Sequence, residues 1–165
     1  SQIRQVESLL HDARVLTSDA VERAQARRRI QTEQALRVLT DVSYHMCNAS
    51  EATRLDDLIA EQPPRLGIQT CFVSRPFQGT STNAELVAAL KDGVKCQAIL
   101  DARFLATDLL PPGHMQRGEC LVVEPLCDAQ NQYGFAVFRL GEVEGFMYEV
   151  ARRLITVAAS RTQKT

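Results

Sequence analysis

The first 48 residues of the chain contain neither proline nor glycine, the two residues that most disfavour the interior of a helix. They are rich in Glu, Gln, Arg, Ala and Leu, which favour helix formation. The pattern predicts one long helix, or two nearly continuous ones. Residues 22–34 are almost all polar, so this part of the helix cannot be buried in a globular core.

Two apolar stripes flank this polar stretch. The first steps by three and four residues, as a coiled-coil seam does, and consists of Val6, Leu9, Ala13, Leu16 and Ala20. The second is wide enough to lie on a sheet or to pair with a partner helix, and consists of Ala35, Val38, Leu39, Val42 and Met46. The basic run at residues 27–29 is interpreted as a solvated helix face. The helix is therefore expected to have an exposed middle and two apolar ends.

Shorter elements are predicted to follow. Residues 48–51 are typical of a helix N-cap, and the second helix that they begin is kinked or ended by Pro63 and Pro64. Residues 68–77 alternate in polarity and predict a first strand. Residues 82–90 begin with the spacing of a capping box and predict a short helix.

The second half of the chain is predicted to be mostly strand. Residues 94–100 predict another strand, and residues 119–127 and 133–140 predict a hairpin. A closing helix is predicted from Gly145, with Met147, Val150 and Leu154 among its apolar positions. This order predicts an α+β fold, in which the N- and C-terminal helices pack on one face of a mixed or antiparallel sheet.

Composition excludes several classes of function. A net charge of −1 provides no basic face for direct contact with nucleic acid. No apolar stretch approaches the roughly 20 residues of a membrane helix, so we expect a soluble segment without membrane contact. The five cysteines include no CxxC pair, and their odd number is a poor basis for disulfides, which favours reduced thiols in the cytoplasm. The histidines are scattered, so no metal site is predicted.

Three motifs resemble the GAF-like domains of bacterial multidomain sensors, over roughly residues 33–160. They are a leucine-glycine-isoleucine turn at residues 66–68, an LLPPG element at residues 109–113, and a late hairpin with Val122, Val123, Pro125, Leu126, Gly134 and Phe138. The resemblance implies a regulatory domain between an upstream sensor and an output module such as a histidine kinase, a diguanylate cyclase or a DNA-binding regulator. In this interpretation Pro125 interrupts pairing at a strand end and Gly134 allows two backbones, or a backbone and a helix, to approach closely.

A ligand site is left open by the sequence. The motifs of cyclic-nucleotide-binding and bilin-binding GAF domains are absent. If a small molecule binds, it should lie between the sheet and residues 78–118, where Arg75, Arg103 and Arg117 could meet an anionic group. The alternative is a thiol-based reductase of the free-methionine-sulfoxide type, with Cys96 and Cys120 as its thiols. No nucleophile, base and oxyanion donor occur together by spacing, so we expect no catalysis and no cofactor.

The sequence therefore predicts a signalling helix at residues 1–32, a GAF-like domain at residues 33–162 and a polar exit at residues 163–165 towards a further module. It is expected to be a cytoplasmic homodimer that relays a signal between covalently linked domains, either with or without a small-molecule ligand. The predicted dimer contacts lie on the terminal helices, at Val6, Leu9, Leu16, Val38, Leu39, Val42, Met46, Met147, Val150 and Leu154.

Overall fold

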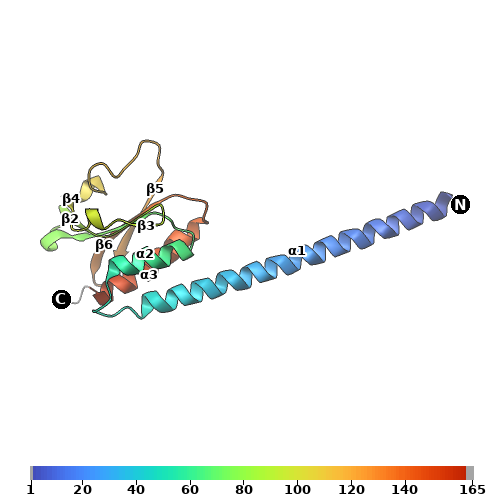
Figure 1. The fold of residues 1–165 in the computed structure, drawn as a ribbon, viewed down its shortest axis with the longest axis horizontal. Coiled ribbons are helices and arrows are strands. Elements are labelled where there is room, and N and C mark those ends of the chain that lie inside the picture. Colours follow the sequence, from blue (N-terminus) through green and yellow to red (C-terminus); the bar gives the residue numbers. More distant parts are fainter. Residues whose placement is uncertain (1, 163–165) are drawn as a thin grey trace. The chain divides into compact units, whose positions relative to one another are not determined.

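A computed structural model describes residues 2–162 of the chain (Figure 1). The chain divides into two compact units, residues 1–39 and residues 40–165. Helix α1 (Gln2–Cys47) makes up the described part of the first unit, and its last turns belong to the second. The sequence predicted one long helix or two nearly continuous ones, and the structure has one.

The second unit is built on one antiparallel sheet, which confirms the α+β class. Its strands are β1 (Cys71–Pro76), β2 (Asn83–Lys91), β3 (Val94–Lys95), β4 (Arg103–Leu105), β5 (Leu121–Cys127) and β6 (Gln132–Arg139). The order across the sheet is β3-β2-β1-β6-β5, and β4 pairs with β2. The predicted hairpin is confirmed as β5 and β6. Pro125 lies inside β5, opposite Phe135, rather than at the strand end, and it is tolerated because β5 is an edge strand.

The predicted helix over residues 82–90 is wrong, because this segment is strand β2. Its Ala, Glu and Leu residues favour a helix locally, but β2 pairs with β1 on one side and with β3 and β4 on the other. Most of its side chains are buried, on both faces of the sheet. The predicted strand over residues 94–100 is also largely wrong, since β3 is two residues long and the 3₁₀ turn η2 (Gln97–Ile99) follows it.

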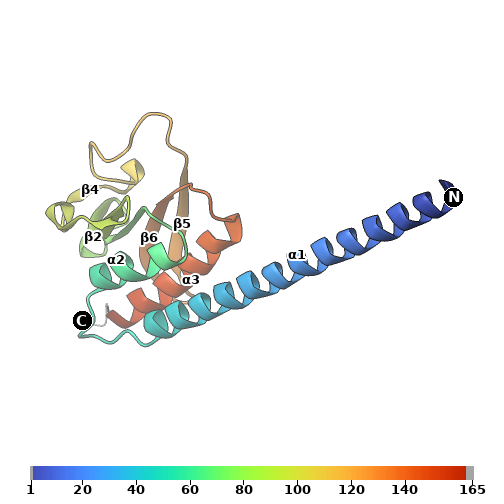
Figure 2. The ribbon, with the colours of Figure 1, turned by 45° about the vertical axis from the view of Figure 1, so that its right-hand side comes forward.

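Two helices cover one face of this sheet. Helix α2 (Leu55–Arg65) lies against β2 and β3, helix α3 (Gly145–Thr162) lies against β5 and β6, and the two helices touch each other. Figure 2 shows both on the same side of the sheet. The closing helix is confirmed. Helix α2 begins later than predicted, after Arg54, because the Asn48 amide instead donates to the carbonyl oxygen of Tyr44 at the end of α1.

The opposite face of the sheet is covered by residues 96–120, which we call the cover segment. It contains η2 and the 3₁₀ turn η3 (Ala106–Asp108), and between them strand β4, which itself belongs to the sheet through its pairing with β2. Its side chains Phe104 and Leu110 are buried in one apolar cluster with sheet residues Phe72, Ala84, Leu86, Ala89 and Val137. The space between the sheet and the cover segment is thus filled largely by the chain's own side chains.

Gly134 brings β6 against β1 more closely than any other residue could. A Cβ atom built at Gly134 would lie 1.9 Å from the carbonyl oxygen of Ser74, and φ at Gly134 is +143°. The expectation that Gly134 permits a close approach of two backbones is confirmed.

Candidate functional site

The three arginines predicted to hold an anionic ligand are not assembled around one cavity. Arg75 and Arg103 are the cross-strand neighbours of Glu85, in one row over β1, β2 and β4. The guanidinium of Arg75 donates to the Glu85 carboxylate at 2.9 and 3.0 Å. The guanidinium of Arg103 lies 4.0 Å from the ring centroid of Phe77. Arg117 is exposed on the cover segment.

A cavity of about 300 Å³ is present at one end of the sheet. It lies where β1 ends, where β2 and β6 begin and where η3 follows β4. Its lining is Pro76, Gly79, Thr80, Ser81, Asn83, Ala84, Ala106, Gln132, Gly134 and Phe135. This position overlaps the region in which a pocket was predicted, but the lining contains no arginine and no other charged side chain.

Three polar side chains of this lining are available to a ligand. Ser81, Asn83 and Gln132 are exposed, and the structure shows no hydrogen bond from their side chains to any residue that it describes. Pro76, Ala84, Ala106 and Phe135 provide apolar surface beside them. The arrangement offers amide and hydroxyl groups next to an apolar wall, as ligand pockets commonly do.

A buried hydroxyl belongs to a residue that pairs with one of the lining residues. Ser74 is 1% exposed, and its Oγ is the one buried side-chain oxygen or nitrogen atom in residues 4–162 that has no hydrogen-bond partner. Its cross-strand neighbour on β6 is Phe135, which lines the cavity. An unpaired buried hydroxyl is rare in a folded protein and calls for a physical reason.

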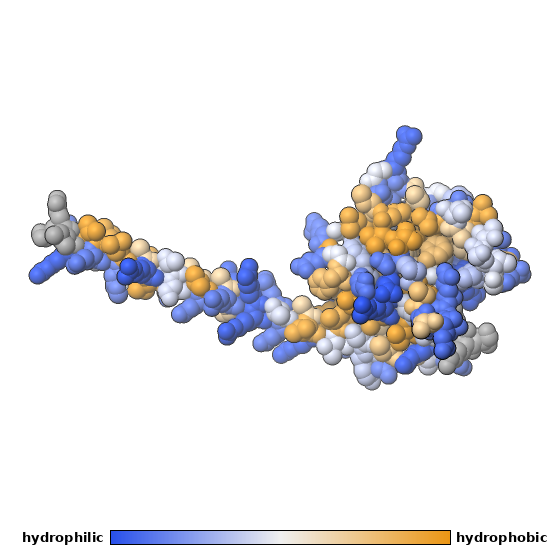
Figure 3. Space-filling view, turned by 180° about the vertical axis from the view of Figure 1, so that it is seen from behind, coloured by the Kyte–Doolittle hydropathy of each residue, from blue (hydrophilic) through white to orange (hydrophobic). Residues whose placement is uncertain are grey.

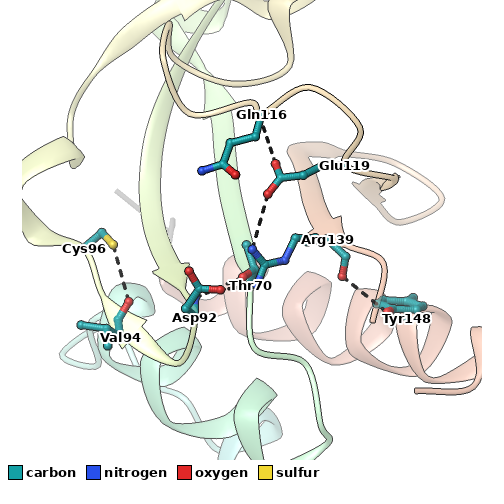
Figure 4. A network of polar contacts seen from close by, with 8 residues as sticks. All are labelled: Thr70, Asp92, Val94, Cys96, Gln116, Glu119, Arg139 and Tyr148. Atoms are coloured by element: carbon teal, nitrogen blue, oxygen red, sulfur yellow. Dashed lines mark hydrogen bonds and ion pairs between the residues drawn. The ribbon is translucent and has the colours of Figure 1, made fainter. Parts of the chain in front are cut away.

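A polar network joins the cover segment to the start of α3 (Figure 4). The Arg139 guanidinium forms ion pairs with Asp92 and, at 3.4 Å, with Glu119 of the cover segment. The main chain of Arg139 donates to the carbonyl oxygen of Thr70 at 3.3 Å and accepts from the Tyr148 hydroxyl at 3.5 Å. The Tyr148 hydroxyl also accepts from the backbone N–H of Gly141 at 2.8 Å. One arginine at the end of β6 thereby contacts four other segments of the chain, which are the residue just before β1, the turn between β2 and β3, the cover segment and α3.

A second network fastens α2 to the edge of the sheet. Asp56, which is 5% exposed, accepts two hydrogen bonds of 3.1 Å from Arg54 and pairs with Lys95 of β3 at 2.9 Å. Burial alone would raise the pKa of Asp56, but the hydrogen bonds from Arg54 and Lys95 outweigh it and lower the pKa below its usual value. Lys95 also pairs with Asp57. Arg54 and Lys95 are both held beside the Asp56 carboxylate, so we infer that this network stabilises the fold.

The predicted dimer contacts fall into three environments. Val6, Leu9 and Leu16 on α1 are 56%, 69% and 69% exposed. Figure 3 shows such apolar residues interspersed with polar ones along this helix. Val42 and Met46, by contrast, are buried within the second unit of the chain itself, so in this conformation they are not surface available to another copy. The remaining predicted positions are half-buried, namely Val38, Leu39, Met147, Val150 and Leu154.

The cysteines are all free thiols. Cys71 is fully buried, and burial strongly raises the pKa of its thiol. Cys96 is half-buried and its thiol lies 3.5 Å from the carbonyl oxygen of Val94, whereas Cys120 is exposed. Among the described residues, no cluster of His, Cys, Asp and Glu has the arrangement of a metal site. None of the helices in this part of the chain combines the length and the apolar character that crossing a membrane requires.

Neither a family model, nor a curated protein, nor a solved structure matches the chain.

Proposed function

We propose that this chain is a non-catalytic, GAF-like regulatory domain that relays a signal through dimerising helices in a bacterial cytoplasmic signalling protein. The observation that carries the proposal is that the two ends of α1 lie in different environments, one exposed and one buried. Its N-terminal part exposes the coiled-coil stripe of Val6, Leu9 and Leu16, while Val42 and Met46 near its other end are buried in the core of the second unit. A continuous helix of this kind links a pairing surface to a folded domain.

The exposed stripe favours pairing with a second helix. Three large side chains that are 56–69% exposed on one stripe are costly in water, since burying one of them is worth roughly 1.5–3 kcal/mol. The spacing of three and four residues is self-complementary, so a second copy of α1 offers a matching seam. An upstream domain that moved one helix of the pair would displace the end of α1 that enters the core.

Helix α3 is the proposed exit of the signal. It lies on β5 and β6, touches α2, and is linked to the cover segment through Tyr148 and Arg139. A shift of the core would therefore reach α3, whose side chains Met147, Val150 and Leu154 are half-buried. In this proposal α3 passes the movement to a covalently linked output module.

Sedimentation velocity on the purified chain tests the pairing. We expect a dimer, and we expect the double variant Leu9→Glu/Leu16→Glu to weaken it at least about a hundredfold, because each dimer loses four apolar side chains from the seam. Ser18→Glu is the matched control, because Ser18 lies on the opposite face of the same exposed helix. A wild-type chain that stays monomeric, or a double variant that dimerises like Ser18→Glu, would refute the proposal.

A further inference from the structure

We infer that the cavity at the end of the sheet is a binding site for a small, uncharged molecule that carries an amide or a similar paired donor and acceptor. The inference extends the proposed relay by giving it a chemical input. It also replaces the anionic ligand that the arginines had suggested.

The size of the cavity limits the ligand. A volume of about 300 Å³ is at the lower end for ligand pockets, and it suits a molecule with a single ring. The interior beneath the cover segment cannot extend it, because Phe104 and Leu110 already pack there against Phe72 and Val137.

The charge of the lining excludes an ionic ligand. None of the residues that line the cavity is charged. Arg75 adjoins the lining residue Pro76, but successive side chains of a strand point to opposite faces, and its guanidinium is held by Glu85 at 2.9 Å. Arg103 is stacked on Phe77. A carboxylate or phosphate in the cavity would therefore lose its hydration without gaining a cation.

The polar groups of the lining select for paired hydrogen bonding. The side chains of Asn83 and Gln132 each carry one carbonyl oxygen and one NH₂ group, and Ser81 adds a hydroxyl. Asn83 and Gln132 are the first residues of β2 and β6, Ser81 precedes β2, and all three share the lining with the apolar side chains of Phe135 and Ala84. A flat ring can lie on this surface while an amide edge exchanges a donor and an acceptor with the two side-chain amides.

The test uses two probes of the same shape and different charge, the neutral nicotinamide and the anionic nicotinate. Each is titrated with the full chain, and binding is followed by ligand-observed NMR. We expect nicotinamide to bind at least about tenfold more tightly than nicotinate. The double variant Asn83→Leu/Gln132→Leu should weaken nicotinamide binding at least about tenfold, because it removes both side-chain amides that would bind the amide of the ligand. Both residues are exposed. Gln97→Leu, at another exposed glutamine outside the lining, should leave it unchanged.

A second variant guards against misfolding of the first. Ser81→Phe, in an exposed connection before β2, should fill the cavity and abolish nicotinamide binding. The inference is wrong if nicotinate binds as tightly as nicotinamide. It is also wrong if neither probe binds up to about 10 mM, or if nicotinamide binding survives in both cavity variants. Sedimentation of the same samples reports dimerisation separately, so a failed ligand site and a failed relay proposal are told apart.

Discussion

Replacement of Gly134 by alanine tests the closest backbone contact of the sheet. The new Cβ would lie 1.9 Å from the carbonyl oxygen of Ser74, 2.9 Å from its carbonyl carbon and 3.0 Å from the Cα of Arg75. All three atoms belong to the main chain of β1, so no side-chain rotation can relieve the overlap. Since a carbon and a carbonyl oxygen normally stay about 3.3 Å apart, β1 and β6 must separate by more than an ångström.

The loss of stability follows from the β1–β6 hydrogen bonds that this separation breaks. The β1–β6 ladder pairs only residues 71–74 with 135–138, so losing its end removes about two hydrogen bonds worth roughly 0.5–1.5 kcal/mol each. Strain at positive φ adds about 1–3 kcal/mol. We expect a loss of about 4 kcal/mol in the free energy of unfolding, which corresponds to a fall in Tm of about 10 °C for a domain of this size.

Gly79→Ala is the matched control. Gly79 also has a positive φ, +71°, but a Cβ there meets no heavy atom within 4 Å. Gly79→Ala therefore carries only the conformational cost of a side chain at positive φ. We expect it to lower the free energy of unfolding by about 1 kcal/mol and Tm by about 3 °C. All three tyrosines, Tyr44, Tyr133 and Tyr148, lie in residues 40–165 and the chain has no tryptophan, so a thermal melt followed by tyrosine near-UV circular dichroism reports on that unit. Equal falls in Tm for the two variants would refute the argument from close approach.

Three further measurements test the buried groups. Because the pKa of Asp56 is lower in the folded chain than in the unfolded one, its contribution to stability is present above about pH 4 and is lost as the pH falls through the folded pKa. Urea midpoints should therefore fall less steeply below pH 4 in Asp56→Asn than in the wild type, and parallel curves would contradict the assignment. With a thiol reagent, the exposed Cys120 and Cys127 should react first and Cys71 only on unfolding, as mass mapping of the labelled peptides can verify, whereas rapid labelling of Cys71 would show that it is not buried. Ser74→Ala should raise stability by about 1 kcal/mol in urea unfolding because it removes an unpaired hydroxyl, and a loss of stability would reveal a partner for that hydroxyl.

Sequence patterns identified the elements whose signals are local. The absence of proline and glycine predicted α1, the helical spacing after Gly145 predicted α3, and two apolar runs around a polar turn predicted the hairpin of β5 and β6. Gly134 was identified correctly because a glycine inside a strand often marks a close approach of backbones.

Strand β2 could not be identified in this way, because its sequence and its environment disagree. The segment NAELVAALK is composed largely of good helix formers, and it is buried on both faces, so no alternation of polar and apolar residues marks it as a strand. Pairing with β1, β3 and β4 decides its conformation, and those partners lie up to about 20 residues away in the sequence.

The candidate site was predictable only in its rough position. The lining of the cavity comes from three separate stretches, residues 76–84, Ala106 and residues 132–135, and none of its polar residues has a spacing that marks it as a ligand-binding group. The arginines were singled out for their charge, but the register of β1 and β2 places Glu85 opposite Arg75, which a reading of local sequence does not reveal. The same holds for Arg139, whose partners Asp92 and Glu119 are fixed by the path of the cover segment.

The two edges of the sheet bear on how the protein behaves at high concentration. An open strand edge is a template on which other chains can add strands and aggregate. Here β3 has only two residues and β4 three, while β5 carries Pro125, which has no N–H to offer an incoming strand. Edge-to-edge growth of the sheet is therefore disfavoured on both sides. The chain can carry an exposed apolar helix stripe without an accompanying tendency to form fibrils through its sheet.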